Sequence, residues 1–99
     1  MTGVINKLIK FTCPCCGYIT LEESGEYEIC PLCRWEDDLS QSLYPYMDGG
    51  ANKPSLVEAQ HNFINYGISN PNLNECSGNI NEFTKDIYWR PIEEINRKI

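Results

Sequence analysis

The sequence predicts a small α+β domain, made of a β-hairpin, one packed amphipathic helix and a C-terminal extension. Three observations lead to this prediction. The chain has 99 residues, which is enough for one domain with a modest core. Two closely spaced cysteine pairs flank a segment rich in strand formers. A helical period of apolar residues then fills 56–66, between a serine and a glycine.

Four cysteines form two C-x2-C pairs, Cys13 with Cys16 and Cys30 with Cys33. A C-x2-C turn can direct both sulfurs at one ion, and two such pairs complete the tetrahedral set that zinc accepts. Four thiolates leave no open coordination position, so we expect one structural zinc ion. Iron is the less favoured occupant of the same ligands. In a chain this small, metal binding is expected to contribute to the free energy of folding.

The two pairs are expected to lie in similar turns. Pro14 and Pro31 follow the first cysteine of each pair, where a fixed φ suits an early turn position. Gly17 follows the first pair, at a place where the chain often turns through positive φ. Arg34 takes the same place after the second pair. If Arg34 is left-handed, the cost is on the order of 1–2 kcal/mol, which metal binding must offset. Otherwise the second turn has a different exit.

Cys15 lies inside the first pair, so Cys13 and Cys15 could both bind the ion, or Cys15 and Cys16 could both be free. The matching spacing of the two pairs points Cys15 away from the ion, as a small buried thiol. C-P-x-C also resembles the motif of thiol–disulfide exchange proteins, in which a helix start activates the thiol. No helical period follows Cys16, so metal binding is favoured. A redox protein or redox sensor that uses Cys15 as a reactive thiol is the alternative. Cys76 falls in a loop and is assigned no role.

The predicted hairpin joins the two cysteine pairs. Residues 8–12 are expected to form a strand that leads into the first turn, and 18–22 the next strand. A turn follows at 23–25, and 26–29 alternates as the returning strand. The result is the plan of a zinc ribbon, which we expect over 8–34.

An acidic segment with a tryptophan follows the second pair, Trp35-Glu36-Asp37-Asp38. One interpretation is a partner-binding site, in which Trp35 grips another protein. The other is a tryptophan packed over the cysteines beside a solvated acidic loop. The second interpretation is favoured, because large aromatic side chains dominate small cores. No base or nucleophile can be placed beside the acids, so no catalytic residue is predicted.

The helix is predicted from its caps and its period. Ser55 and Glu58 form a capping-box pattern, and Gly67 can end the helix in a left-handed conformation. Gln60 falls within the apolar arc and needs a partner if buried, such as loop backbone. His61 lies at the edge of the polar arc and is expected to be a surface residue. The apolar arc consists of Leu56, Val57, Ala59, Phe63, Ile64 and Tyr66.

One domain is expected over 1–99, with the acidic loop and the helix at 35–67 and the extension at 68–99. In the extension, 82–89 could form a helical turn or a strand, and 92–98 a short final helix.

Charge and hydropathy limit the partners. The net charge is −6, and the cysteine-rich third has few basic residues, so nucleic acid is not the expected partner. An acidic surface suits a basic protein partner. The chain shows no signal-peptide pattern and no run of about 20 apolar residues. We therefore expect a cytoplasmic protein that does not contact the membrane and keeps its thiols reduced.

The sequence resembles the CPCC family of small cysteine-rich bacterial proteins, which has no established activity. The resemblance covers about residues 11–67 and implies a zinc-binding domain with Cys13, Cys16, Cys30 and Cys33 as ligands. It transfers no catalytic residue. The matching residues are Cys13-Pro14-Cys15-Cys16-Gly17-Tyr18, Thr20-Leu21, Cys30-Pro31, Cys33, Trp35-Glu36-Asp37-Asp38, Gln41, Gly49-Gly50-Ala51-Asn52, Ser55-Leu56, Glu58-Ala59 and Asn62-Phe63.

These observations favour a cytoplasmic protein-binding or adaptor module that is stabilised by structural zinc, and not an enzyme. An immunity-like or antitoxin-like protein is one form of this hypothesis, because a small acidic chain could cover a basic toxin. The alternatives from other classes are the redox protein that uses Cys15 and a nucleic-acid-binding zinc ribbon.

Overall fold

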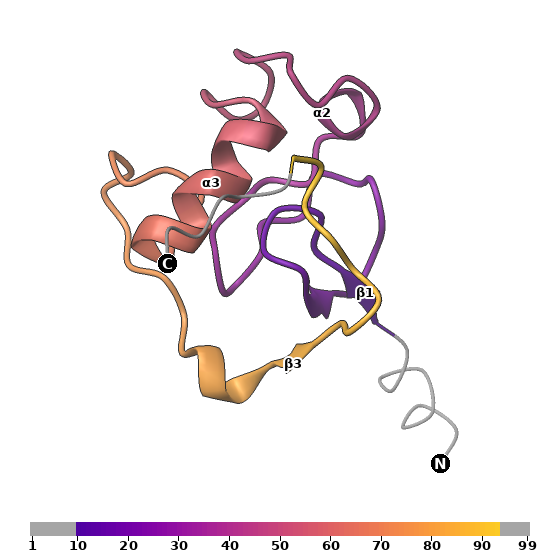
Figure 1. Ribbon diagram of the computed structural model, residues 1–99, viewed down its shortest axis with the longest axis vertical. Helices are drawn as coiled ribbons and strands as arrows, with labels where there is room; N and C mark the ends of the chain where they lie inside the picture. The colour runs from indigo at the N-terminus through magenta and orange to yellow at the C-terminus, as the bar shows by residue number, and fades with distance from the viewer. Residues whose placement is uncertain (1–9, 94–99) are drawn as a thin grey trace.

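The computed structural model describes residues 10–93 and confirms the α+β class (Figure 1). These residues form a three-stranded antiparallel sheet, two α-helices and one 3-10 helix. None of the helices among residues 10–93 has the length and apolar character needed to cross a membrane. The elements are β1 (Phe11–Thr12), β2 (Tyr18–Leu21), α2 (Leu39–Leu43), α3 (Leu56–Tyr66), η1 (Ile80–Glu82) and β3 (Thr84–Lys85).

The sheet is centred on β2, the strand that follows the first cysteine pair. β1 pairs antiparallel with one edge of β2, with an irregular register between Phe11 and Thr12. β3 pairs antiparallel with the other edge, where Tyr18 lies opposite Lys85. The C-terminal extension therefore supplies the third strand, in line with the strand alternative for 82–89. Of the expected first strand at 8–12, the structure has Phe11–Thr12, and Lys10 lies outside it. Residues 8 and 9 lie outside the described part of the chain.

The prediction that 26–29 forms the strand paired with 18–22 is wrong. Residues 26–29 do not return to β2, because Ile29 instead forms an antiparallel bridge with Glu36. Around this bridge the Tyr27 amide donates to the Asp37 carbonyl at 3.0 Å, and the Cys30 amide donates to Trp35 at 2.8 Å. Tyr27 has a φ of 64°, which interrupts an extended strand. Each cysteine pair thus lies at the tip of its own short hairpin.

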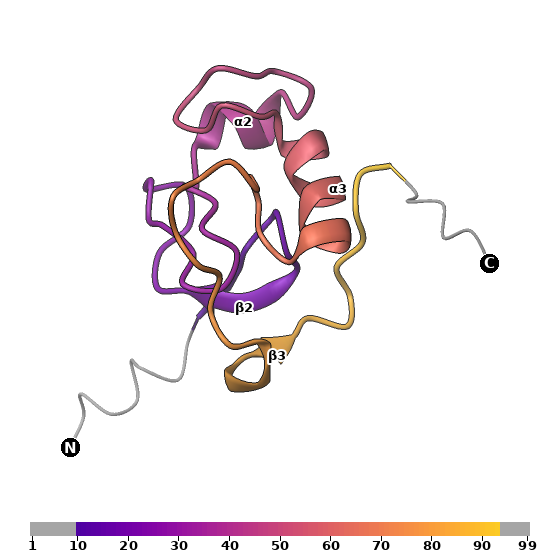
Figure 2. The ribbon, with the colours of Figure 1, turned by 90° about the vertical axis from the view of Figure 1, so that its left-hand side faces the viewer.

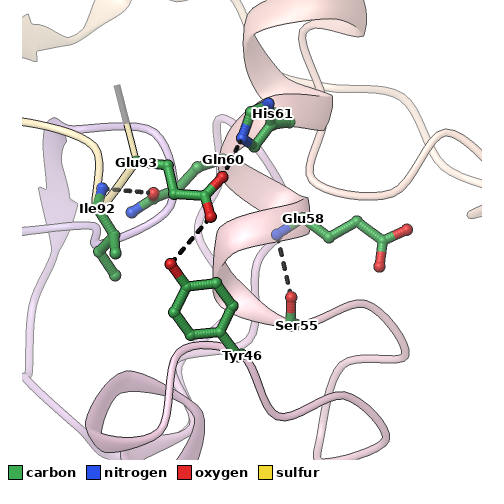
Figure 3. Close-up of polar contacts among 7 residues, drawn as sticks. All are labelled: Tyr46, Ser55, Glu58, Gln60, His61, Ile92 and Glu93. Atoms are coloured by element: carbon green, nitrogen blue, oxygen red, sulfur yellow. Dashed lines mark hydrogen bonds and ion pairs between the residues drawn. The ribbon is translucent and has the colours of Figure 1, made fainter. Parts of the chain in front are cut away.

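The caps of α3 are those predicted. The Ser55 hydroxyl accepts a hydrogen bond from the Glu58 amide at 3.1 Å. Gly67 has a φ of 79°, and its amide donates to the Phe63 carbonyl at 2.8 Å. Figure 3 shows the Glu58 carboxylate directed away from Ser55, so one half of the capping box fixes the helix start.

The apolar face of α3 is narrower than predicted. Leu56, Val57, Ala59 and Gln60 are buried in the first two turns. Phe63 is partly buried, with its ring edge-to-face against Tyr18 at 6.2 Å between centroids. Ile64 and Tyr66 are exposed, contrary to their place in the predicted arc. Leu56 and Ala59 belong to the core cluster and Phe63 packs against it, whereas Ile64 and Tyr66 are not part of it.

The core is built around the cysteines themselves. Figures 1 and 2 show the extension leaving α3, joining the sheet as its edge strand β3 and then running back toward α3. The predicted final helix at 92–98 lies mostly outside the described residues. The fully or almost fully buried members of the core are Cys13, Cys15, Cys16, Leu21, Cys30, Leu32, Cys33, Trp35, Leu56 and Ala59.

Candidate metal centre

Four cysteine sulfurs meet at the centre of the core. The Sγ atoms of Cys13, Cys16, Cys30 and Cys33 all lie within 4.8 Å of one another, and all four residues are buried. Cys13 and Cys33 sulfurs are 3.7 Å apart, and those of Cys16 and Cys30 are 3.9 Å apart. A tetrahedron with Zn–S bonds of about 2.3 Å has edges of about 3.8 Å, whereas a disulfide bond is about 2.05 Å long. The four sulfurs are therefore spaced as a tetrahedral set that could hold a metal ion.

Two turns of the same geometry bring these sulfurs together. We call residues 13–17 the first cysteine knuckle and residues 30–34 the second. In the first knuckle the Gly17 amide donates to the Cys13 carbonyl at 2.9 Å, and in the second the Arg34 amide donates to Cys30 at 2.9 Å. Gly17 has a φ of 80° and Arg34 a φ of 73°, so both turns end in the left-handed conformation. The cost expected for a left-handed arginine, about 1–2 kcal/mol, is thus present in this fold.

The sulfur of Cys30 receives several donors. The backbone amides of Leu32 and Cys33 both point at it at 3.4 Å. The Thr20 hydroxyl lies 3.1 Å away and can donate to it as well. Donors of this kind stabilise a thiolate. This local field favours the deprotonated cysteine that metal binding requires.

The four thiols do not ionise alike. Burial raises the pKa of Cys13 and of Cys33 well above the ordinary thiol value. Hydrogen bonds from the Cys13 thiol, and then from Cys16 and Cys33, lower the pKa of Cys30. These hydrogen bonds favour the thiolate form of Cys30 over the neutral thiol. A bound cation would replace these protons and balance the buried negative charge.

The C-terminal extension covers the first cysteine knuckle. The Asp86 amide donates to the Gly17 carbonyl at 2.9 Å, and the Asp86 carboxylate accepts from the Thr12 hydroxyl at 2.6 Å. The indole ring of Trp89 packs on Gly17 so closely that a Cβ there would overlap it. Gly17 therefore meets two demands, a positive φ and the approach of an aromatic ring.

A different part of the extension covers the second cysteine knuckle. The Ser69 amide donates to the Cys33 carbonyl at 2.8 Å, and the Gly78 amide donates to Leu32 at 2.9 Å. Arg34 Nε donates to the Cys76 carbonyl at 2.9 Å. Cys76 itself is an exposed free cysteine, and its backbone is what the fold uses here.

The segment Trp35 to Asp38 is largely internal. Trp35 is fully buried among the cysteines, as the packed interpretation predicts. Asp37 and Asp38 are also buried, so the solvated acidic loop is wrong. Their carboxylates cap loops, with Asp37 accepting from the Gly25 amide at 2.6 Å and Asp38 from Ala51 at 2.9 Å. Burial raises the pKa of Asp37.

These positions bear on the predicted partner-binding site at Trp35, Glu36, Asp37 and Asp38. Three of the four side chains are enclosed and cannot meet another protein in this fold, whereas Glu36 is half-buried. The sequence pattern could not reveal the amides that pair with Asp37 and Asp38, because they come from distant loops.

Hydrogen bonds from the backbone and side chain of Asn52 to the Gln41 side chain explain why Gln41 and the segment 49–52 belong to the matching pattern. Gln41 is fully buried, and its Nε2 donates to the carbonyls of Met47 at 3.0 Å and Pro54 at 3.1 Å. Its Oε1 accepts from the Asn52 amide at 3.0 Å. Asn52 in turn pairs with the backbone of Glu36, accepting at 2.9 Å and donating at 2.8 Å. Gln41 and the loop 49–52 thus hold the second hairpin in place.

The helix α3 joins the first cysteine knuckle to the end of the described chain. Gln60 is buried, as its place in the arc suggests, and its Nε2 donates to the Pro14 carbonyl at 2.9 Å. Its Oε1 accepts from the Ile92 amide at 2.9 Å (Figure 3). The expectation that Gln60 would find loop backbone partners is confirmed.

Glu93 makes a second link from the extension to the rest of the fold, also drawn in Figure 3. Its carboxylate accepts from the Tyr46 hydroxyl at 2.9 Å and lies 3.3 Å from His61 Nε2. His61 is partly exposed on α3, as expected, and is not among the four-sulfur group.

Cys15 lies in the core beside the four sulfurs but outside their group. It is almost fully buried, in line with the packed interpretation. A reactive thiol needs access to its oxidant or disulfide partner. The burial of Cys15 therefore weighs against the redox alternative.

The fold and the four sulfurs define a small cysteine-rich protein with a buried site that could hold a metal ion. The sequence model of the family described as Cysteine-rich CPCC matches residues 11–82, well over half of the chain. The chain belongs to this family, which confirms the resemblance and extends it past residue 67. No curated protein matches the chain.

Proposed function

We propose that this chain is a protein-binding module stabilised by one structural zinc ion. The observation that carries the proposal is the closed, buried set of four sulfurs, on which both cysteine knuckles and the extension converge. A set of four protein ligands leaves no coordination position for a substrate. The ion would supply positive charge and cross-links, and the chain's own residues would orient the sulfurs and exclude water.

The four cysteines suit a structural zinc site better than a redox site. Four thiolates in tetrahedral spacing are a common structural zinc site in reducing compartments. The sulfur separations of 3.7 and 3.9 Å suit a shared ion. We therefore place the module in the cytoplasm, where the thiols stay reduced, and treat iron as the competing occupant.

Protein binding is supported by the surface. The net charge of −6 disfavours nucleic acid, which proteins bind mainly through lysine and arginine. Exposed tyrosine and leucine side chains such as Tyr44 and Leu43 suit contacts with another protein. The charge favours a basic partner, and an immunity-like or antitoxin-like role is one form of this function.

Native mass spectrometry of protein from metal-replete cells tests the metal. One zinc per chain, with all cysteines reduced, is the expected result. One iron per chain would replace zinc in the proposal, and disulfides among Cys13, Cys16, Cys30 and Cys33 would overturn it.

Affinity capture from the protein's own cells tests binding, with the zinc-loaded chain as bait. The unfolded Cys30→Ser chain serves as the matched control for nonspecific retention. We expect a stable basic partner that the folded chain alone retains. Failure to retain any such partner, both in this experiment and after in-cell crosslinking, would contradict the binding function.

A further inference from the structure

The negative charge of this protein comes from one stretch of the chain. Residues 22–48 contain eight of the 14 acidic residues and one of the eight basic residues, and two of the eight acids, Asp37 and Asp38, are buried. The rest of the chain therefore has six acidic and seven basic residues and is close to neutral. Four thiolates on a divalent ion would add negative charge beside the same stretch.

The same stretch exposes large apolar side chains. Leu39 and Leu43 lie four residues apart on α2, so they share one face of that helix. They are 51% and 65% exposed. Tyr44, which follows α2, is 67% exposed, and Tyr27 in the preceding loop is 53% exposed. Exposed apolar groups of this size that lie side by side mark contact surfaces more often than isolated ones do.

The loop 22–28 and α2 form one continuous surface. A Cβ at Gly25 would lie 3.4 Å from Leu39 Cδ1, so the loop rests against Leu39 at the start of α2. Asp37 ties the two together, because its carboxylate accepts from the Gly25 amide and its carbonyl accepts from Tyr27. Figure 2 shows α2 at the end of the molecule opposite β3. The members of this acidic–apolar face are Glu23, Glu26, Tyr27, Leu39, Leu43 and Tyr44.

We propose that the acidic–apolar face docks a basic protein segment that carries apolar side chains, an inference that rests on the protein-binding function above. Complementary charge would steer a basic segment to the face, and the leucines and tyrosines would bury its apolar groups. A second copy of this chain is a poor occupant, because it would bring the same acids to the interface. Nucleic acid would meet repulsion from the same charges.

Binding of a defined probe to the zinc-loaded full chain tests the face. The probe is a synthetic helical peptide of lysine and leucine, and the readouts are its Kd and the backbone amide shifts in NMR spectra. The test variant is Leu43→Lys. The matched control is Tyr88→Lys, since Tyr88 is 86% exposed in the extension and the charge change is the same.

We expect Leu43→Lys to weaken peptide binding roughly tenfold and Tyr88→Lys less than twofold. The amide shifts should gather at 22–28 and 39–44. Equal weakening by both variants, or shifts gathered elsewhere, would show that the face is wrongly chosen while the protein-binding function stands. Absence of peptide binding would contradict the proposed docking face. If no cellular partner is found either, the protein-binding function is contradicted as well. A dimer that dissociates on Leu43→Lys would assign the face to a second copy and overturn the proposal.

Discussion

The two cysteine knuckles have the same backbone geometry and different side chains. Both close with an amide-to-carbonyl bond of 2.9 Å across the cysteine pair, and both end at a residue with positive φ. That residue is Gly17 in the first knuckle and Arg34 in the second. Glycine adopts this conformation freely, whereas arginine is strained by about 1–2 kcal/mol. The turn is thus set by the sulfur positions and the closing bond rather than by the residue at its end.

What separates the knuckles is the segment that covers each one. Trp89 and Asp86 cover the first knuckle, and they lie beyond the family match at 11–82. Ser69 and Gly78 cover the second knuckle, and they lie within it. The glycine at Gly17 leaves room for the indole ring, and the side chain of Arg34 instead binds the Cys76 carbonyl. The residue at the end of each turn therefore matches the cover that the turn receives.

The largest expected effect comes from removing one sulfur of either knuckle. Cys13→Ser and Cys30→Ser should both lose the metal and unfold, because apparent binding free energies of structural zinc sites reach about 10–16 kcal/mol. Circular dichroism and metal content measure this result. Cys15→Ser is the matched control and should keep both the metal and the fold. Loss of metal from only one of the two variants would contradict the claim that both knuckles are needed to hold the ion.

Substitutions at Gly17 and Arg34, the last residues of the two knuckles, should change the free energy of unfolding by different amounts. Gly17→Ala should lower the free energy of unfolding by about 2–4 kcal/mol, because it combines left-handed strain with overlap on Trp89. Arg34→Gly should change it by less than about 1 kcal/mol, since relief of strain offsets the lost bond to Cys76. Denaturant unfolding of the metal-loaded chains measures both.

Combining Gly17→Ala with Trp89→Ala separates the effect of the Trp89 ring from the backbone strain at Gly17. Removal of the ring should recover part of the loss, which a double-mutant cycle reports as coupling. Strictly additive losses would show that Trp89 does not constrain Gly17.

The cover of the second knuckle is tested by Gly78→Ala. The added Cβ would overlap the Pro31 carbonyl, which is backbone and cannot rotate away. We expect a loss of about 1–3 kcal/mol in the free energy of unfolding. Hydrogen exchange should show faster opening at Leu32 to Arg34 than at 13–17. Equal acceleration at both knuckles would contradict separate covers.

The smallest effects concern two aspartates that support different knuckles. Burial raises the pKa of Asp37, so its contribution to stability is present at low pH and lost as pH rises through the folded value. Donation from the Thr12 hydroxyl lowers the pKa of Asp86, so its contribution is present above 3.8 and lost as pH falls through the lowered value. Carboxyl carbon NMR titration should place Asp37 above 3.8 and Asp86 below it. The reverse order would refute these assignments.

The sequence predicts the features that depend on residues close together in the chain. The spacing of Cys13, Cys16, Cys30 and Cys33 predicts the cluster, and Ser55 and Gly67 predict both ends of α3. These features depend on residues close together in the chain, so their physical chemistry is visible in the sequence. The left-handed Gly17 belongs to the same class, whereas the sequence left the conformation of Arg34 open.

What the sequence could not predict depends on distant partners. β3 has two residues, too few for a period, and only its pairing with β2 identifies it. The sequence pattern predicts Asp37 and Asp38 as solvated, because it does not show that the amides of Gly25 and Ala51 donate to them. The width of the buried face of α3 likewise depends on where the core ends. These features are set by tertiary packing, which overrides local propensity.

The central claim is that one shared ion at four sulfurs fixes both cysteine knuckles. Amide NMR spectra of the reduced chain, recorded before and after metal removal with a chelator, test it most directly. We predict dispersed signals for 13–17 and 30–34 that collapse together on chelation and return when zinc is added back. A reduced, metal-free chain that keeps the full dispersed spectrum would contradict the account.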